Sequence, residues 1–257
     1  MINDIEIIRG FNTPMRNSQY RGADLGTISS LNEYIAFRSA HGIDDNSYKD
    51  LYLGDYFQIV DGTYNAVWMV AHFDYYYNKG GSTYISPKGV VLIPRTTCGS
   101  SKMNNEDTTV GGYKSSIAHT TTCPNIANAL QTVLGSYLLS SSKLISSNIS
   151  SSALSMAGGS WQGASTDWEW IQDRCIIPSE VQIYGCTVAS SSWYDIGEAN
   201  QKLAVFNFIN NVEYNRSSFW LRSVSSNLRF AAVSSYGYAA ASLASSSTVL
   251  RPLIYIG

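Results

Sequence analysis

Hydrophobic and polar positions change in short blocks along this chain, a pattern that predicts two helices among many short strands. Ser30 and Glu33 have the spacing of a capping box, and the helix that they open is expected to end before Gly42. A second helix is expected from Pro124, because proline is common in the first turn of a helix. Its apolar residues recur at helical spacing and form one face: Ile126, Leu130, Val133, Leu134, Tyr137 and Leu138.

Most of the remaining apolar segments have the length and composition of β-strands. A hairpin is expected over residues 56–73, with its turn at Asp61-Gly62, and a buried strand is expected over residues 89–94. The segment 140–152 has eight serines among its thirteen residues, which predicts a long surface loop rather than a boundary between domains. The fold class expected is α+β with short antiparallel strands. Further strands are expected at residues 2–8, 168–171, 175–178, 219–224, 228–234 and 249–256.

The composition changes this picture at the surface of the molecule. The chain has 257 residues, a net charge of −2 and a charged fraction of 14%, well below the roughly 25% of an average domain. Its 38 Ser and 18 Tyr must therefore cover much of the surface. Such residues are typical of contact surfaces that bind by hydrogen bonds and rigid aromatic area. The near-neutral charge and the lack of Lys/Arg runs argue against a nucleic-acid partner.

The sequence shows no membrane or targeting signal. No stretch approaches the roughly 18 apolar residues of a membrane span, so membrane insertion is not expected. Residues 1–10 lack the basic start and apolar core of a signal peptide, so we expect a protein made in the cytoplasm. Its cysteines should then remain free thiols, and because no Cys-x-x-Cys pair occurs, a zinc site is not expected. The four cysteines are Cys98, Cys123, Cys175 and Cys186.

Few residues have the spacing of catalytic or metal-binding chemistry. His72 and Asp74 share one face of a predicted strand, where such a pair is more often solvated than bound to a metal. Asp167, Glu169 and Asp173 cluster, but a solvated strand face explains them more simply than a paired acid and base. The common nucleophile, phosphate-binding and metalloprotease motifs are missing as well. We therefore expect no enzyme activity, no cofactor and no metal.

The C-terminal segment 219–253 carries the clearest candidate site. Trp220, Arg222 and Arg251 belong to two bulky strand motifs and are expected to form a buried scaffold. Small and tyrosine residues fill the segment between them, a composition suited to a recognition surface on a rigid frame. A Ser/Ala-rich β-meander without any partner would have the same composition and remains the alternative. The candidate ligand-binding residues are Ser225, Ser226, Asn227, Arg229, Ser235, Tyr236 and Tyr238.

Several short motifs follow one another along the chain from Tyr20 to the C-terminus. They are residues 20–27 (YRGADLGT), 51–57 (LYLGDYF), 73–78 (FDYYYN), 91–94 (VLIP), 103–104 (MN), 111–113 (GGY), 179–185 (SEVQIYG), 219–222 (FWLR) and 251–252 (RP). In this order they resemble a family of phage and prophage proteins from gut Firmicutes that are often encoded near virion structural genes. The C-terminal arrangement is also similar to the C-type-lectin-like domain of retroelement-diversified phage receptor-binding proteins, of the major tropism determinant type.

The resemblance implies a C-type-lectin-like domain over residues 20–257. An arm of residues 1–19 would precede it. Because a lone monomer would expose the apolar residues Ile2, Ile5, Ile7 and Ile8, this arm is expected to contact another subunit or virion protein, within a homotrimer. The protein would be a tail or head fibre of the virion, whose variable surface binds a bacterial surface glycan or protein. The sequence departs from the family pattern in two places. Val249-Leu250 stand where the family has Gly-Val, so the last turn is expected to differ. The calcium-lectin motifs are missing, so calcium-dependent sugar binding is not expected.

Two other functions remain open at this point. A capsid decoration protein would have the same domain without a receptor role. A formylglycine-generating-type enzyme would share the lectin-like fold, but it needs a reactive cysteine pair close to the C-terminal core, and the last cysteine of this chain is Cys186. The position of the protein on the particle, and a reverse transcriptase gene beside a near-repeat of its 3′ end, would discriminate among these functions.

Overall fold

The computed structural model describes residues 16–81, 84–146, 168–189, 201–214 and 216–257. The strand expected over residues 2–8 and most of the expected arm lie outside these ranges. The end of that arm is hydrogen-bonded to the domain. Arg16 Nη1 donates to the Leu51 carbonyl at 3.1 Å, and the Phe73 N–H donates to the side-chain oxygen of Asn17 at 3.0 Å. Among the described residues, no helix is both long enough and apolar enough to cross a membrane.

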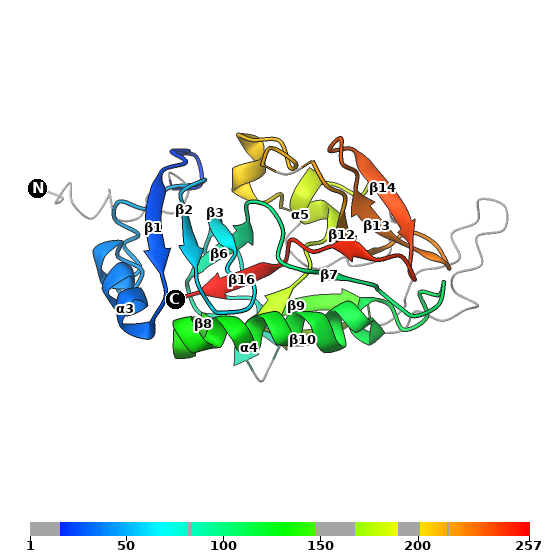
Figure 1. The fold of residues 1–257 in the computed structure, drawn as a ribbon, viewed down its shortest axis with the longest axis horizontal. Coiled ribbons are helices and arrows are strands. Elements are labelled where there is room, and N and C mark those ends of the chain that lie inside the picture. The colour runs from blue at the N-terminus through cyan, green and yellow to red at the C-terminus, as the bar shows by residue number, and fades with distance from the viewer. Residues whose placement is uncertain (1–15, 82–83, 147–167, 190–200, 215) are drawn as a thin grey trace, which may run out of the picture.

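The larger of the two main sheets has seven strands (Figure 1). Its order is β1 (Asp24–Ile28), β2 (Tyr56–Ile59), β3 (Val67–Phe73), β6 (Val90–Pro94), β16 (Leu253–Ile256) and β11 (Cys175–Ile176), and β8 (Leu138–Leu139) also pairs with β16. β1 and β2 pair in parallel, and the other pairs are antiparallel. Because β16 pairs with three other strands, the C-terminal residues of the chain lie inside this sheet.

Most expected strands of this sheet are present, but β1 was not expected, and Leu138, expected on the face of the second helix, lies in β8. β2 and β3 form the expected hairpin, and every residue of β6 is buried. The connection between β2 and β3 is longer than the two-residue turn expected, because residues 60–66 separate them. The Asp61 carboxylate holds this loop by accepting the N–H groups of Thr63 at 2.8 Å and Tyr64 at 2.7 Å.

The second main sheet has five strands and is built chiefly from the C-terminal part of the chain. Its order is β14 (Ala239–Leu243), β13 (Arg229–Val233), β12 (Phe219–Val224), β15 (Thr248–Val249) and β7 (Ser100–Ser101). β12, β13 and β14 form an antiparallel meander. Strand β14 was not expected from the sequence. The strand expected over residues 249–256 is in fact two strands, because residues 250–252 separate β15 from β16 and include Pro252, which has no N–H to donate.

Two short ribbons complete the β structure: β9 (Ser141–Ser146) with β10 (Trp168–Asp173), and β4 (Gly80–Gly81) with β5 (Tyr84–Ile85). The expectation of a surface loop over residues 140–152 is wrong for β9, and residues 147–152 lie outside the described ranges. Ser141 and Lys143 are buried in β9, and the Lys143 ammonium donates to the Ser141 hydroxyl at 2.6 Å and to the Asp173 carbonyl at 2.9 Å. Polar groups that find partners inside the protein do not require solvent, so a serine-rich segment can be a buried strand.

Both expected helices are present. α3 (Leu31–Ala40) begins after Ser30, whose hydroxyl accepts the Glu33 N–H at 3.3 Å. The Glu33 carboxylate accepts the N–H of Ser29 instead of Ser30, so only half of the capping box forms. α4 (Cys123–Leu134) follows a π-helical turn, buries the expected apolar residues up to Leu134 and packs beside α3, β8 and β11.

A short third helix was not expected. α5 (Glu180–Tyr184) begins with a complete capping box of Ser179 and Gln182, and it packs beside β12. Single 3₁₀ turns occur at Tyr113–Ser115 (η1), Gly135–Tyr137 (η3) and Ala204–Asn207 (η4). With few helices and many strands arranged in sheets, the expectation of an α+β fold is confirmed.

Candidate functional site

The predicted ligand-binding residues fall into two groups at opposite ends of β13. Because β13 has five residues that rise by about 3.3 Å each, the two groups lie roughly 16 Å apart. They therefore do not form one compact site, and each turn must be judged by its own surroundings. Ser225, Ser226, Asn227 and Arg229 lie at the turn between β12 and β13, whereas Ser235, Tyr236 and Tyr238 lie at the turn between β13 and β14.

The turn between β13 and β14 is held in one conformation by hydrogen bonds from three directions. The backbone of Ser234 bonds to Tyr238 and Gly237, which closes the turn on itself. The Gly237 carbonyl accepts the Tyr184 hydroxyl at 3.1 Å and the Asn211 side-chain amide at 3.0 Å. Gly237 has φ of 90°, and a Cβ there would lie only 2.9 Å from Asn210 Oδ1. Glycine is therefore required at this position.

Tyr236 and Tyr238 project from this turn into solvent, with exposed fractions of 74% and 61%. Their rings are parallel, with centroids 6.2 Å apart and planes inclined by 2°. Each ring orders the other, so the pair offers apolar area and two hydroxyl groups at a small cost in conformational entropy. This is the part of the predicted site that has the geometry of a contact surface.

The turn between β12 and β13 is tied down more closely. Thr109 is buried beneath it, and its hydroxyl donates to the Ser226 carbonyl at 2.7 Å while its N–H donates to the Asn227 carbonyl at 3.1 Å. The Ser225 hydroxyl donates to the Ala189 carbonyl at 2.6 Å, and Arg229 Nη1 donates to the Ala241 carbonyl at 3.3 Å. The side chains of Asn227 and Arg229 remain exposed, but most polar groups of this turn are used within the protein.

The three residues expected to form a scaffold are all buried, so this expectation of burial is confirmed. Trp220 Nε1 donates to the Ser101 carbonyl at 2.9 Å and so ties β12 to β7. Arg222 Nη1 donates to Gln182 Oε1 at 2.8 Å in α5. Arg251 Nε donates to the Pro94 carbonyl at 2.9 Å, and burial lowers the pKa of Arg251 to about 10. These bonds connect the smaller sheet to α5 and to the larger sheet.

The loop of residues 208–214 connects the exposed turn to Tyr20, which precedes β1 at the edge of the larger sheet. Asn211 in this loop bonds to Gly237, as described above, and its backbone carbonyl accepts a hydrogen bond from Arg251. At the other end, Phe208 stacks on Tyr20 with ring centroids 5.8 Å apart. The hydroxyls of Tyr20 and Tyr214 lie 3.0 Å from each other. A second aromatic cluster thus lies next to the turn of Tyr236 and Tyr238.

Sequence reasoning missed this second cluster. Tyr20 and Tyr214 are 194 positions apart, and no local motif connects them. Tyr20 carries a signal only as the first residue of a short motif, and Tyr214 carries none. Their proximity depends on how the loop of residues 208–214 crosses between the two sheets, which no periodicity in the sequence encodes.

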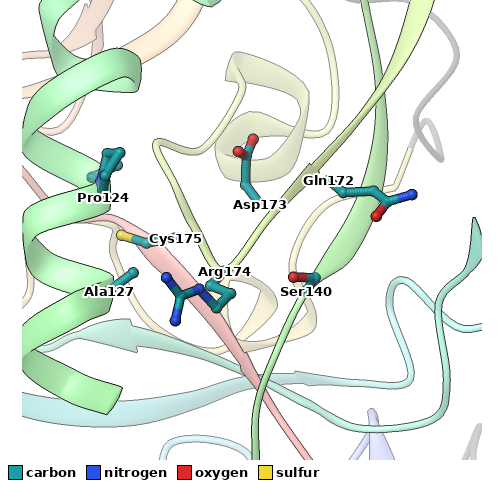
Figure 2. A pocket seen from close by; sticks show the side chains of 8 residues that line it. Pro124, Ala127, Ser140, Gln172, Asp173, Arg174 and Cys175 are labelled. Atoms are coloured by element: carbon teal, nitrogen blue, oxygen red, sulfur yellow. The ribbon is translucent and has the colours of Figure 1, made fainter. Parts of the chain in front are cut away.

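A small cavity of about 180 Å³ lies at the start of α4 (Figure 2). It is smaller than the roughly 300–1,000 Å³ of typical small-molecule sites. Arg174 closes one side by donating to the side chains of Gln131 and Asn128 on α4. The residues that line it are Cys123, Pro124, Ala127, Ser140, Gln172, Asp173, Arg174 and Cys175.

The titratable groups around this cavity are not arranged as a nucleophile and a base. Burial, followed by the proximity of Cys123, raises the pKa of the Cys175 thiol well above its usual range, so the reactive thiolate is disfavoured. His119 Nδ1 lies 2.8 Å from the Lys114 carbonyl and Nε2 lies 3.3 Å from the Asp173 carboxylate. Burial alone would lower the pKa of His119, but Asp173 outweighs it and raises the pKa. Both ring nitrogens are therefore occupied. All four cysteines are free thiols, and only Cys186 is exposed.

The other residues considered for chemistry have structural partners. His72 is buried rather than solvated, and its Nδ1 accepts the Ala204 N–H at 3.0 Å. Asp74 accepts the Tyr48 hydroxyl at 2.5 Å and the Gly89 N–H at 3.0 Å. The expectation of a solvated pair is thus wrong, because both side chains serve as internal acceptors. In the part of the chain that the structure describes, no three His, Cys, Asp or Glu side chains gather as metal ligands would.

The acidic residues Glu169 and Asp173, expected to cluster, form ion pairs with different partners. Glu169 forms an ion pair with Lys114 at 2.7 Å, and Asp173 forms one with His119 at 3.3 Å. The carboxylate of Asp173 is mostly buried, so the expected solvated face is wrong at this position. Asp167 lies outside the described residues. Neither described carboxylate is arranged as half of an acid–base pair.

Comparison of the chain with known proteins found no match among protein-family models, curated proteins or solved structures. The fold and the exposed tyrosine turn must therefore carry the functional argument on their own geometry.

Proposed function

We propose that this chain is a phage virion protein that binds a bacterial surface ligand through a recognition surface displayed on a C-type-lectin-like domain. The two helices, the sheet that incorporates the C-terminal strand and the second sheet of short strands support this fold. The order of short motifs that resembles phage and prophage proteins supports the location in a virion. The protein would be a tail or head fibre that assembles with other virion proteins as a homotrimer.

The observation that carries the recognition role is the exposed pair of Tyr236 and Tyr238. An isolated surface tyrosine is unremarkable, but two parallel rings on a turn that is fixed by Tyr184 and Asn211 form a preorganised contact area. Tyrosine is among the residues that contribute most to binding when an interface buries them. By contrast, the turn of residues 225–228 uses most of its polar groups internally, which makes it the weaker of the two candidates.

The test measures binding of the fluorescently labelled full-length protein to a panel of gut Firmicutes cells. Replacing Tyr236 and Tyr238 together by Ala should weaken binding by about thirtyfold, the effect of losing roughly 2 kcal/mol at a hot spot. Tyr77→Ala is the matched control, because Tyr77 is a half-exposed tyrosine outside the turn. If the double variant binds as tightly as the wild type, or if no strain binds either protein, the recognition role fails. Immunogold labelling of the particle would then distinguish capsid decoration from other structural roles.

A further inference from the structure

Arg95 follows β6 and lies against the second aromatic cluster. Its backbone N–H donates to the Val67 carbonyl at 2.8 Å, which fixes the start of its side chain. Its guanidinium lies over the ring of Tyr56 at 3.6 Å and over the ring of Tyr214 at 3.8 Å, measured from Cζ to each ring centroid. Stacking uses the flat faces of a guanidinium. Its N–H groups lie in its plane and remain available to acceptors.

No acceptor meets those N–H groups within the part of the chain that the structure describes. Arg95 Nε is buried without a hydrogen-bond partner, and Arg95 takes part in none of the ion pairs among the described residues. Arg95 is only partly buried, so the end of its side chain can meet a group from solvent. Other arginines of this protein are paired: Arg21 with Asp50 and Asp55, for example. A stacked guanidinium with an unused edge is the arrangement that a planar anion completes.

The neighbouring hydroxyls add a further donor. Tyr20 and Tyr214 share one hydrogen bond, so one hydroxyl donates and the other keeps a proton for a ligand. Burial, then the hydrogen bond to Tyr214, raises the pKa of Tyr20 to about 12, and this hydroxyl therefore stays protonated at neutral pH. The ring of Phe208, stacked on Tyr20, is 46% exposed. Cation, hydroxyl donor and exposed ring thus adjoin one another.

We propose that Arg95 binds the carboxylate of an acidic saccharide. The carboxylate oxygens would accept from Nη1 and Nη2, a sugar hydroxyl would bond to the Tyr20–Tyr214 pair, and the apolar face of the sugar ring would lie against Phe208. This ligand class rests on the proposed function only in placing the saccharide on a bacterial surface. Continuity with the displayed turn supports it, because the loop that carries Phe208 and Tyr214 also bonds to Gly237 through Asn211.

One carboxylate of the chain itself could compete for this site. Glu213 precedes Tyr214, is exposed, and lies close enough to raise the pKa of Tyr20. It forms no ion pair among the described residues. Glu213→Gln removes this competitor without touching the guanidinium, so the variant should bind an acidic saccharide as tightly as the wild type or more tightly.

The experiment measures the binding of trigalacturonate to the full-length protein by calorimetry. The methyl ester of the same trisaccharide keeps the rings and removes the charge. The wild type should bind the acid about tenfold more tightly than the ester, because charge-assisted hydrogen bonds are lost in the ester. Arg95→Gln should abolish this preference. Arg38→Gln should preserve it, because Arg38 lies on α3 and stacks on Tyr137, outside the second aromatic cluster and both turns.

Folding of each variant is checked by its urea midpoint. If Arg95→Gln is unfolded, Arg95→Lys decides: lysine keeps the charge but lacks the planar fork, and we expect it to lose about fivefold or more in affinity. Equal affinity of the wild type for acid and ester, or wild-type binding by folded Arg95 variants, would overturn the site. A hexaglutamate peptide that binds as tightly as trigalacturonate would overturn the saccharide assignment. If the saccharide experiment fails but the Tyr236/Tyr238 double variant loses cell binding, the acidic-saccharide site is wrong and the recognition function is still supported.

Discussion

Two buried tryptophans show how differently the two sheets are held together. Trp68 lies in β3 of the seven-stranded sheet and Trp220 in β12 of the five-stranded sheet, and both side chains are fully buried. Trp220 donates its indole N–H to the Ser101 carbonyl, whereas the indole N–H of Trp68 meets no hydrogen-bond acceptor among the residues that the structure describes. Trp68 therefore contributes through volume alone, and Trp220 also fixes β7 against β12. At these two positions the larger sheet is held by packing alone, whereas the smaller one is also held by a specific hydrogen bond.

The largest expected effect comes from removing either ring. Trp68→Ala and Trp220→Ala should each lower the free energy of unfolding by about 3–5 kcal/mol, because each leaves a large cavity. Urea denaturation with a shared slope would give both values. A loss below about 1 kcal/mol at either position would mean that the ring is not part of a close-packed core, and the comparison would not hold.

The next largest expected effect is a loss of folding stability at low pH, caused by the buried His72 in β3 of the larger sheet. Burial, then the nearby Lys79 charge, lowers the pKa of His72 to about 3. The unfolded state, with a pKa near 6.5, therefore binds a proton that the folded state does not bind between pH 6.5 and 3. Stability should fall as the pH falls through this window, by about 1.4 kcal/mol per pH unit, or about 2 kcal/mol from pH 7 to 5.

His72→Asn provides the control for that measurement. Asparagine keeps a side-chain acceptor for the Ala204 N–H but cannot titrate. Urea midpoints at pH 7 and pH 5 should show a shallower loss in the variant, even if the variant is less stable at both values. Equal losses in the two proteins would show that His72 is protonated in the folded state.

A direct comparison of the tryptophans requires smaller substitutions. Phenylalanine retains most of the ring volume in both places and removes the indole N–H. Trp220→Phe should cost about 1–2 kcal/mol more than Trp68→Phe, since only the former leaves the Ser101 carbonyl without its partner. Equal costs would contradict the difference described between the two sheets.

A buried hydroxyl tests the same idea at one end of the smaller sheet. Thr109→Val keeps the shape of the side chain and removes its hydrogen bond to the Ser226 carbonyl, which should cost about 1 kcal/mol. Thr63→Val is the control, because Thr63 is exposed and should tolerate the change within about 0.5 kcal/mol. Thermal or urea unfolding measured on both variants gives the difference.

The smallest effect on stability is expected at the displayed turn. Tyr236→Ala and Tyr238→Ala should each change the free energy of unfolding by about 0.5 kcal/mol or less, because both side chains are exposed. A larger loss would mean that these rings belong to the framework, in which case a loss of cell binding by the same variants could not be assigned to contact with a ligand.

Much of the fold could be predicted from local signals. Ser30 and Pro124 marked the starts of helices, and the continuous apolar run of β6 marked a buried strand. Strand β14 could not be predicted, because Ala239–Leu243 has little β-type composition and becomes a strand by pairing with β13. β9 was missed for a related reason: its serines and Lys143 become acceptable inside the protein in part through Ser86 and Asp173, which lie far away in the sequence.

The candidate site was predictable only in part. Tyr236 and Tyr238 stood out because small and tyrosine residues fill the segment between two bulky strand motifs, a composition suited to a recognition surface. The sequence placed them in one group with Asn227 and Arg229, and only the length of β13 separates the two sets. Arg95 had no visible signal, because its aromatic neighbours come from β2 and from the loop of residues 208–214.

The backbone of Gly237 limits how the displayed turn can diversify. Its positive φ and the nearby Asn210 oxygen exclude any side chain between the two rings. Codons 236 and 238 can therefore vary while codon 237 cannot, and the number of surfaces that this turn can present is the product of the choices at two positions, not three. A population of related chains should show high sequence entropy on both sides of an unchanging glycine.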